Sequence, residues 1–159
     1  MTALHTLGVA EVAALVQRRE VSPVEVVTAC LTRLEALEPT LQAWVTVDRH
    51  GALAAAKRCE QTIQQGGSIG ALTGVPVGLK DIIYTAGLRT AAGSRVYANF
   101  VPTYDATVTV RLQQAGAIIL GKTVTTEFAT ADPSPTHNPW NTAHTPGGSS
   151  SGSAAAVAA

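Results

Sequence analysis

The chain has 159 residues, of which 46% are hydrophobic and 14% charged, the composition of a folded protein with a single core. Eleven basic and eleven acidic side chains cancel, so no basic field exists to hold nucleic acid or an anionic membrane. No apolar run has the length of a membrane span, and the N-terminus lacks the charged start and apolar stretch of a signal peptide. We therefore expect a cytoplasmic protein with no nucleic-acid or membrane partner.

The apolar face of the first predicted helix, residues 8–19, is formed by Val9, Val12, Ala13 and Val16. A second helix should begin with Ser22 as N-cap and Pro23 at its first position, and should end near Pro39. We expect the two helices to form a hairpin over residues 1–40. Cys30 lies on the apolar stripe of the second helix, and Cys59 on that of a third, so both should be buried, reduced thiols.

Residues 41–159 alternate predicted strands and helices, which indicates a partial α/β core. The strands are expected at 43–47, 75–83 and 117–120. A helix is expected over 51–65, and another should begin with Asp105 as N-cap and turn Val108, Leu112 and Ala115 inward. The alternation favours a mostly parallel sheet with helices around it.

Lys80 is unusual because it lies with Asp81 inside the apolar, β-branched stretch 75–83. Burying an ammonium group costs several kcal/mol, roughly, unless the group is paired or neutral. In one interpretation the strand ends here, Lys80 reaches water and Asp81 caps the next turn. In the other, burial keeps the amine of Lys80 neutral, so that it can act as a base.

The stretch from Gly116 to Thr123 matches the spacing of a phosphate-binding loop, Gly, four residues, Gly-Lys-Thr. The context contradicts such a loop, because the four middle residues are themselves the predicted strand and a helix precedes them. We interpret the match as chance. The four histidines, His5, His50, His137 and His144, are scattered and show no metal-ligand spacing with cysteines or carboxylates. The sequence therefore predicts no metal and no cofactor.

The last segment joins a Gly- and Ser-rich run, residues 146–152, to an Ala-rich helix expected from Ser153. Such a run can bring hydroxyl and backbone N–H groups close to a ligand. The alternative is a flexible linker with an Ala-rich tail. In the irregular loop before it, Trp140 is expected to anchor the loop rather than to stack on a ligand.

Four segments, taken in this order, resemble the amidase signature family: residues 74–81 around Lys80, 121–128, Asn138 to Trp140, and 146–158. The resemblance covers nearly the whole chain and implies a larger mixed, mostly parallel sheet flanked by helices, an α/β fold that is incomplete here. The family uses a Ser–Ser–Lys triad. By resemblance Lys80 is the triad lysine, Ser149 is the bridging serine held after a cis peptide bond, and Ser150, Gly147 and Gly148 support it.

The triad chemistry suits these residue types. Amide hydrolysis needs a nucleophile, a proton shuttle to the leaving nitrogen and an oxyanion site. A short hydroxyl between a lysine and the nucleophile can relay the proton by donating to one and accepting from the other. Ser151 departs slightly from the family, which more often has glycine at this position. The family's acylating serine lies roughly two dozen residues beyond the bridging serine, so the sequence is expected to be the N-terminal part of a single amidase domain, inactive alone.

Three functions remain open. The first is an amidase that hydrolyses a small-molecule carboxylic amide to an acid and ammonia or an amine. The second is the ammonia-releasing subunit of an amidotransferase, which would require partner chains. The third is a non-catalytic module that keeps the Gly/Ser segment as a cradle for a small ligand. A homo-oligomer is compatible with each of them.

Overall fold

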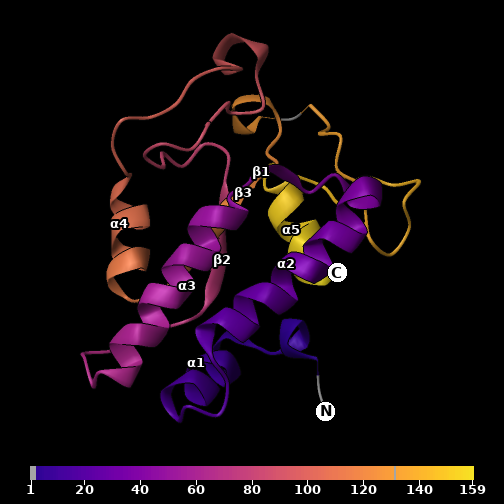
Figure 1. The fold of residues 1–159 in the computed structure, drawn as a ribbon. Coiled ribbons are helices and arrows are strands. Elements are labelled where there is room, and N and C mark those ends of the chain that lie inside the picture. The colour runs from indigo at the N-terminus through magenta and orange to yellow at the C-terminus, as the bar shows by residue number, and fades with distance from the viewer. Residues whose placement is uncertain (1–2, 131) are drawn as a thin grey trace. The chain divides into compact units, whose positions relative to one another are not determined.

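The computed structural model describes residues 3–130 and 132–159, drawn in Figure 1. The chain divides into two compact units that are interleaved along the sequence. Unit 1 comprises the chain up to Arg33 together with Asp48–Val77 and Val110–Leu120. Unit 2 comprises Leu34–Val47, Gly78–Thr109 and Gly121–Ala159. The predicted site residues all belong to unit 2.

Unit 1 is built mainly from helices with side-chain caps at their N-termini, of which the cap by Ser22 was predicted. It contains η1 (Leu4–Thr6), α1 (Val9–Gln17), α3 (Arg49–Gln64) and the first part of α2 (Pro23–Leu41). Ser22 and Glu25 form a reciprocal cap, because each backbone N–H donates to the other side chain. Asp48 accepts from Gly51 N at 3.0 Å and caps α3.

The core of unit 1 follows the predicted apolar faces. Its buried members are Val12, Ala13, Val16, Val26, Ile63 and Val75. Val9 was expected among them but is 58% exposed, because it is the first residue of α1 and precedes the turn that packs. Cys30 and Cys59 are free thiols. They are half-buried rather than buried, and desolvation raises the pKa of each.

Helix α2 continues past the predicted stop near Pro39 and ends at Leu41. A proline in the last turn removes one N–H without breaking the turns that follow it. The end is set by Gln42, whose φ of 50° is left-handed. The Glu38 carboxylate then accepts from Ala43 N at 3.1 Å and Trp44 N at 3.0 Å. These bonds turn the chain directly into the first strand.

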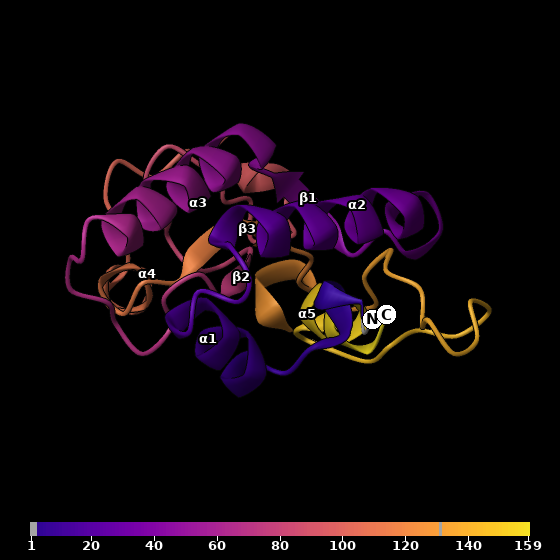
Figure 2. The ribbon, with the colours of Figure 1, turned by 60° about the horizontal axis from the view of Figure 1, so that its bottom comes forward.

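The sheet is mixed and has the order β1–β3–β2, which can be followed in Figure 2. Its strands are β1 (Trp44–Val47), β2 (Pro76–Lys80) and β3 (Ile118–Thr123). β1 is antiparallel to β3 and pairs Trp44 with Thr123 and Val47 with Gly121. β2 and β3 are parallel, since Ile118 N donates to Val75 O and Asp81 N donates to Thr123 O. The mixed sheet flanked by helices confirms the fold class expected from the sequence.

Two of the predicted strand boundaries need correction. β2 ends at Lys80 instead of continuing to residue 83, because Asp81 begins a turn. β3 continues beyond residue 120 through Lys122 to Thr123. Gly121 allows this continuation, because a Cβ there would lie 2.1 Å from Thr46 O. The strand therefore contains both the middle and the end of the apparent phosphate-loop motif, which confirms that the match is chance.

The long segment between β2 and α4 contains η2 (Arg95–Tyr97). Helix α4 (Thr107–Gln114) begins two residues after Asp105, which was predicted to be its N-cap. The Asp105 carboxylate instead accepts from Ala86 N at 2.7 Å. Val108 was predicted to face inward but is 46% exposed, and Thr109 is the buried residue of this helix. The Thr109 hydroxyl donates to Tyr84 O, and this bond fixes the orientation of its turn.

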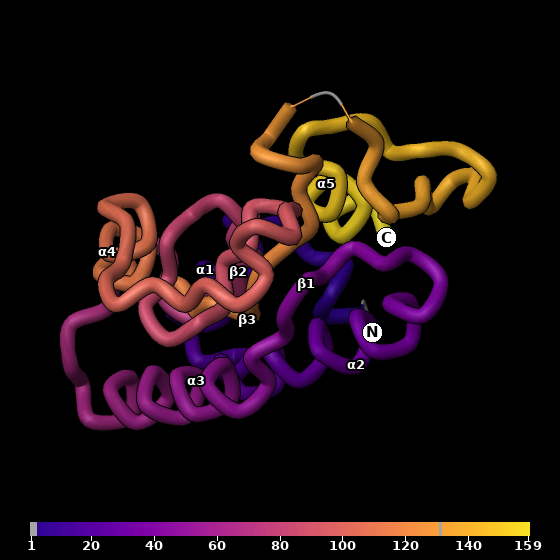
Figure 3. The backbone as a smooth tube through the Cα atoms, turned by 90° about the horizontal axis from the view of Figure 1, so that it is seen from above, coloured from indigo at the N-terminus to yellow at the C-terminus, as the bar shows by residue number. Residues whose placement is uncertain are grey.

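The chain after β3 passes through η3 (Glu127–Ala129) and an irregular loop into α5 (Ser151–Ala158). Figure 3 shows this path in orange and yellow. A cluster of Leu41, Ala43 and Ala155 buries α5 against the end of α2 and the start of β1. Trp140 was predicted to anchor the loop, but its side chain is 84% exposed. Its backbone N–H donates to Asn138 Oδ1 at 2.9 Å.

Candidate active site

Lys80 and Ser149 meet although 69 positions separate them in the chain. Lys80 is the last residue of β2 and is half-buried. Its Nζ donates to Ser149 Oγ at 2.6 Å, which confirms the predicted approach of the two groups. The strand ends here because the next residue turns away, so the lysine amine lies at the edge of the sheet beside the Gly/Ser segment. An amine and a hydroxyl at this distance can exchange a proton.

The backbone around Ser149 is fixed from both sides. The peptide bond between Gly148 and Ser149 is cis, and Gly147 has a φ of 83°. Thr126 N donates to Ser149 O at 3.1 Å. A Cβ on Gly148 would approach Thr126 Cγ2 at 2.9 Å, so glycine lets the segment lie against residue 126. Thr126 was not singled out from the sequence, because a backbone donor leaves no signal in residue type.

Three consecutive serines have different surroundings. Ser150 is exposed, and its side chain makes no capping bond although it occupies the N-cap of α5. Its carbonyl accepts from Ala154 N. Ser151 is buried, and its hydroxyl donates to Gly147 O at 2.7 Å. Ser151, where the family more often has glycine, therefore makes the side-chain bond that closes the Gly/Ser segment.

Helix α5 is docked closely on the chain that follows β3. Gly152 N donates to Val124 O at 3.0 Å. A Cβ at this position would lie 2.1 Å from Ala43 O and 2.4 Å from Val124 N. The Thr123 and Ser153 hydroxyls lie 2.7 Å apart. These contacts fix the start of α5, and with it the segment that carries Ser149.

Asp81 follows Lys80 directly and is fully buried. Its Oδ2 accepts from Ala91 N at 3.1 Å, and its carbonyl accepts from Ala92 N at 2.9 Å. Within the part of the chain that the structure describes, Oδ1 has no hydrogen-bond partner. Desolvation raises the pKa of the carboxyl, and the nearby Lys122 charge opposes this shift. The expectation that Asp81 caps the turn after the strand agrees with these bonds.

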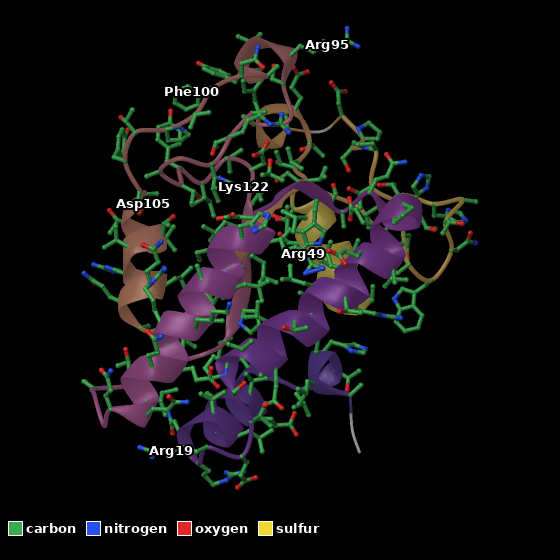
Figure 4. The ribbon with its side chains drawn as sticks, in the orientation of Figure 1. Arg19, Arg49, Arg95, Phe100, Asp105 and Lys122 are labelled. Atoms are coloured by element: carbon green, nitrogen blue, oxygen red, sulfur yellow. The ribbon has the colours of Figure 1, made fainter. Side chains whose placement is uncertain are left out.

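Lys122 is the second buried charge of unit 2, and it is labelled in Figure 4. Its Nζ donates to Thr90 Oγ1 at 2.8 Å, to Thr85 Oγ1 at 3.2 Å, and to Ile83 O. Burial lowers the pKa of Lys122 to about 8, while Asp81 and Asp105 act in the opposite direction. Sequence reasoning assigned it no role beyond the chance Gly-Lys-Thr match, and its position within a buried strand was the available signal.

Among residues 3–130 and 132–159, no group of three or more His, Cys, Asp or Glu side chains could hold a metal ion. Over the same described ranges, no helix is both long and apolar enough to cross a membrane. The chemistry available at the site is proton exchange between the Lys80 amine and the Ser149 hydroxyl. The Ser149 side chain is half-buried, so a further group can reach its hydroxyl.

A lysine at the end of a strand thus donates a hydrogen bond to a serine in the Gly/Ser segment, which leads into a helix of small residues. The chain belongs to the amidase family, whose model matches residues 25–159. It is 47% identical over its whole length to the A subunit of glutamyl-tRNA(Gln) amidotransferase from Dehalococcoides mccartyi, of which it covers 34%. The chain spans about a third of the length of such curated relatives.

Solved structures of the family have the same fold. Peptide amidase from Stenotrophomonas maltophilia superposes with a TM-score of 0.89 at 37% identity, over 95% of this chain and 34% of that one. A bacterial aryl acylamidase of the amidase signature family superposes with a TM-score of 0.92 at 29% identity, over 99% of this chain and 34% of the other. The family expected from the sequence motifs is thereby confirmed.

Proposed function

We propose that the protein cleaves the C–N bond of a carboxylic amide, with Lys80 as the base and Ser149 as the bridging hydroxyl. The observation that carries the proposal is the 2.6 Å contact between Lys80 Nζ and Ser149 Oγ. A structural ion pair would use a carboxylate partner, whereas here the lysine contacts a hydroxyl that can pass a proton onward. The family to which the chain belongs acts on such bonds.

The proposed reaction needs an acylating serine, which the family carries in a Gly-Gly-Ser segment roughly two dozen residues beyond the bridging serine. Its oxygen bonds to the amide carbon while its proton passes to Ser149 Oγ, and the Ser149 proton passes to Lys80 Nζ. The C–N bond then breaks as the proton returns to the leaving nitrogen, which departs as ammonia or an amine. Water hydrolyses the resulting ester by the same relay and releases the acid.

Ser150, Gly147 and Gly148 are proposed to support Ser149. Gly148 leaves space for the backbone beside Thr126 Cγ2, and Gly147 adopts a left-handed φ of 83° that favours glycine. The Ser150 carbonyl starts α5 and its exposed hydroxyl is free to face a substrate. No metal or cofactor has a part in this scheme, because the relay and the nucleophile suffice for amide hydrolysis.

A second candidate, the ammonia-releasing subunit of an amidotransferase, is favoured by the names of the curated relatives. Two relatives, 44% and 47% identical to this chain, are A subunits of glutamyl-tRNA(Gln) amidotransferases. The relay would be the same, but the amide would be that of glutamine. The ammonia would pass to a partner chain instead of being released into solution. The amide substrate and the presence of partners therefore distinguish the two candidates.

The test is ammonia release by the gene product, expressed to the natural end of its reading frame, from glutamine and from simple aliphatic and aromatic amides. An amidase should release ammonia from simple amides alone. A component of an amidotransferase should act on glutamine, and its rate should rise with partner chains. In both cases Lys80→Ala should abolish most release. A fully folded wild-type protein that releases none, with or without partners, would leave the small-ligand cradle as the better account.

A further inference from the structure

The segment between Asp81 and Ala92 forms a closed loop whose base adjoins Lys80. Asp81 Oδ2 accepts from Ala91 N, and Asp81 O accepts from Ala92 N. One residue therefore fastens both ends of the loop with its side chain and its backbone. Asp81 N also donates to Thr123 O, so the base of the loop is continuous with the β2–β3 pairing. A shift of this base would move the preceding residue, Lys80.

Lys122 fills the interior of the same loop. The Thr85 hydroxyl donates to Ile83 O, and the Thr90 hydroxyl donates to Leu88 O, so each hydroxyl proton is already used. Both hydroxyl oxygens must therefore accept from Lys122, as Ile83 O does. Three acceptors require three N–H donors, which only the ammonium form provides. Asp81, buried nearby, carries the opposite charge.

The far end of the loop is linked to Ser149. Ala92 O accepts from Phe128 N at 2.8 Å, and two residues earlier Thr126 N donates to Ser149 O at 3.1 Å. Ala92 and Phe128 are non-glycine residues with left-handed φ values of 54° and 47°. Such conformations persist only where the surroundings enforce them. These hydrogen bonds and the short chain segment between them connect the backbone beside Lys80 to the backbone of Ser149.

We propose that Asp81 and Lys122 are positioning residues that hold Lys80 and Ser149 in contact through the loop 81–92. The catalytic meaning of this positioning rests on the proposed function. Neither residue touches the amine or the hydroxyl directly in the described contacts, so each acts through the backbone it holds. Substitution of a purely structural pair would affect folding alone. Substitution of a positioning pair should change the Lys80–Ser149 contact in a protein that remains folded.

The experiment compares variants of the gene product, expressed to the natural end of its frame. Lys122→Met and Asp81→Asn remove the charges, and Thr90→Val removes one acceptor while Thr90→Ser retains it. Lys57→Met on α3 and Asp132→Asn are matched changes at exposed positions. Acetylation of Lys80 by acetic anhydride is measured by mass spectrometry, together with kcat and KM for ammonia release. Circular dichroism establishes that each variant is folded.

Lys122→Met, Asp81→Asn and Thr90→Val should raise the acetylation rate of Lys80 by up to about tenfold, the change expected when one hydrogen bond to its amine is lost. Their kcat should fall while KM stays close to wild type, and Thr90→Ser and both surface variants should behave as wild type. If the two charge variants fail to fold, the two Thr90 variants decide the question.

Folded Lys122→Met, Asp81→Asn or Thr90→Val proteins with wild-type Lys80 acetylation would overturn the proposal. The labelling does not require activity, so it separates this inference from the proposed function. Increased Lys80 labelling in a protein that never releases ammonia would support the positioning role and contradict the amidase reaction. If the wild type releases ammonia and these variants release it at the same rate, the result would support the amidase reaction and contradict the positioning role.

Discussion

The two lysines of unit 2 have contrasting environments at neighbouring strands. Lys80 is half-buried and its amine contacts one serine hydroxyl, whereas Lys122 is fully buried and contacts three oxygens. The first arrangement suits a group that exchanges a proton with its single partner, and the second suits a group that holds a loop through several acceptors. Residue type alone does not distinguish these roles, because both lysines lie within apolar, β-branched stretches.

The buried Lys122 should make stability depend on alkaline pH. Its pKa is lowered to about 8 from the usual 10.5, so between these values the unfolded chain binds more protons than the folded one. The free energy of unfolding contributed by this group therefore rises with pH over that window, by up to about 3 kcal/mol. Urea unfolding of wild type and Lys122→Met at pH values from about 7 to about 10.5 should give a difference that grows with pH. A flat or falling difference would show that the three oxygen partners of Lys122 affect its pKa in the folded chain more than burial does.

The serine run offers a matched pair for the role of the buried hydroxyl. Ser151→Ala removes the bond to Gly147 O and should lower the free energy of unfolding by about 0.5–1.5 kcal/mol. Ser150→Ala removes an exposed hydroxyl and should change it by less than about 0.5 kcal/mol. Thermal unfolding of the two variants measures both. Equal effects would contradict the assignment of Ser151 as the residue that closes the segment.

At the scale of single residues, the contact between Lys80 and Ser149 was predictable from the sequence, because the motifs around both residues are specific. The role of Ser151 was not, since the family comparison made this serine look like a minor departure from glycine. Thr126 lies within the motif segment 121–128, but no role could be predicted for it, because its contribution is a backbone N–H. Roles that depend on backbone groups, or on one hydroxyl among three, require coordinates.

At the scale of elements, the start of α5 should be intolerant of any side chain at residue 152. Gly152→Ala adds a Cβ only 2.1 Å from Ala43 O, and should destabilise the chain by about 1–3 kcal/mol. This loss is expected although alanine favours a helix over glycine by about 1 kcal/mol. Ala154→Ser, at an exposed position of the same helix, is the control, and urea unfolding measures both variants. A Gly152→Ala protein as stable as wild type would show that α5 is not docked against Ala43 and Val124.

The helices and strands were largely predictable because their periodic apolar faces and caps are local signals. The errors lie where a distant group decides the outcome. β3 is longer than predicted because Gly121, Lys122 and Thr123 pair with β1, a strand far earlier in the sequence. Asp105 is not an N-cap because its carboxylate binds Ala86 N instead. Trp140 stays exposed because nothing in the described part of unit 2 covers its ring.

For the whole molecule, the family and the fold class followed from four short motifs in a fixed order, and both are confirmed by the family match and the superpositions. The division into two interleaved units was not predictable, because it depends on contacts between segments far apart in sequence. The substrate is not encoded in these motifs either, since they specify the proton relay and not the pocket for the acyl group.

Lys80 and Ser149 are proposed to work as one catalytic unit, and a double-mutant comparison measures this directly. Ammonia release is measured for wild type, Lys80→Ala, Ser149→Ala and the double variant of the gene product, expressed to the natural end of its frame. Each single change should remove most of kcat, and the double change should cost little more than Lys80→Ala alone, because members of a relay act together. A folded Lys80→Ala protein with wild-type turnover, or losses that multiply in the double variant, would contradict the proposed relay.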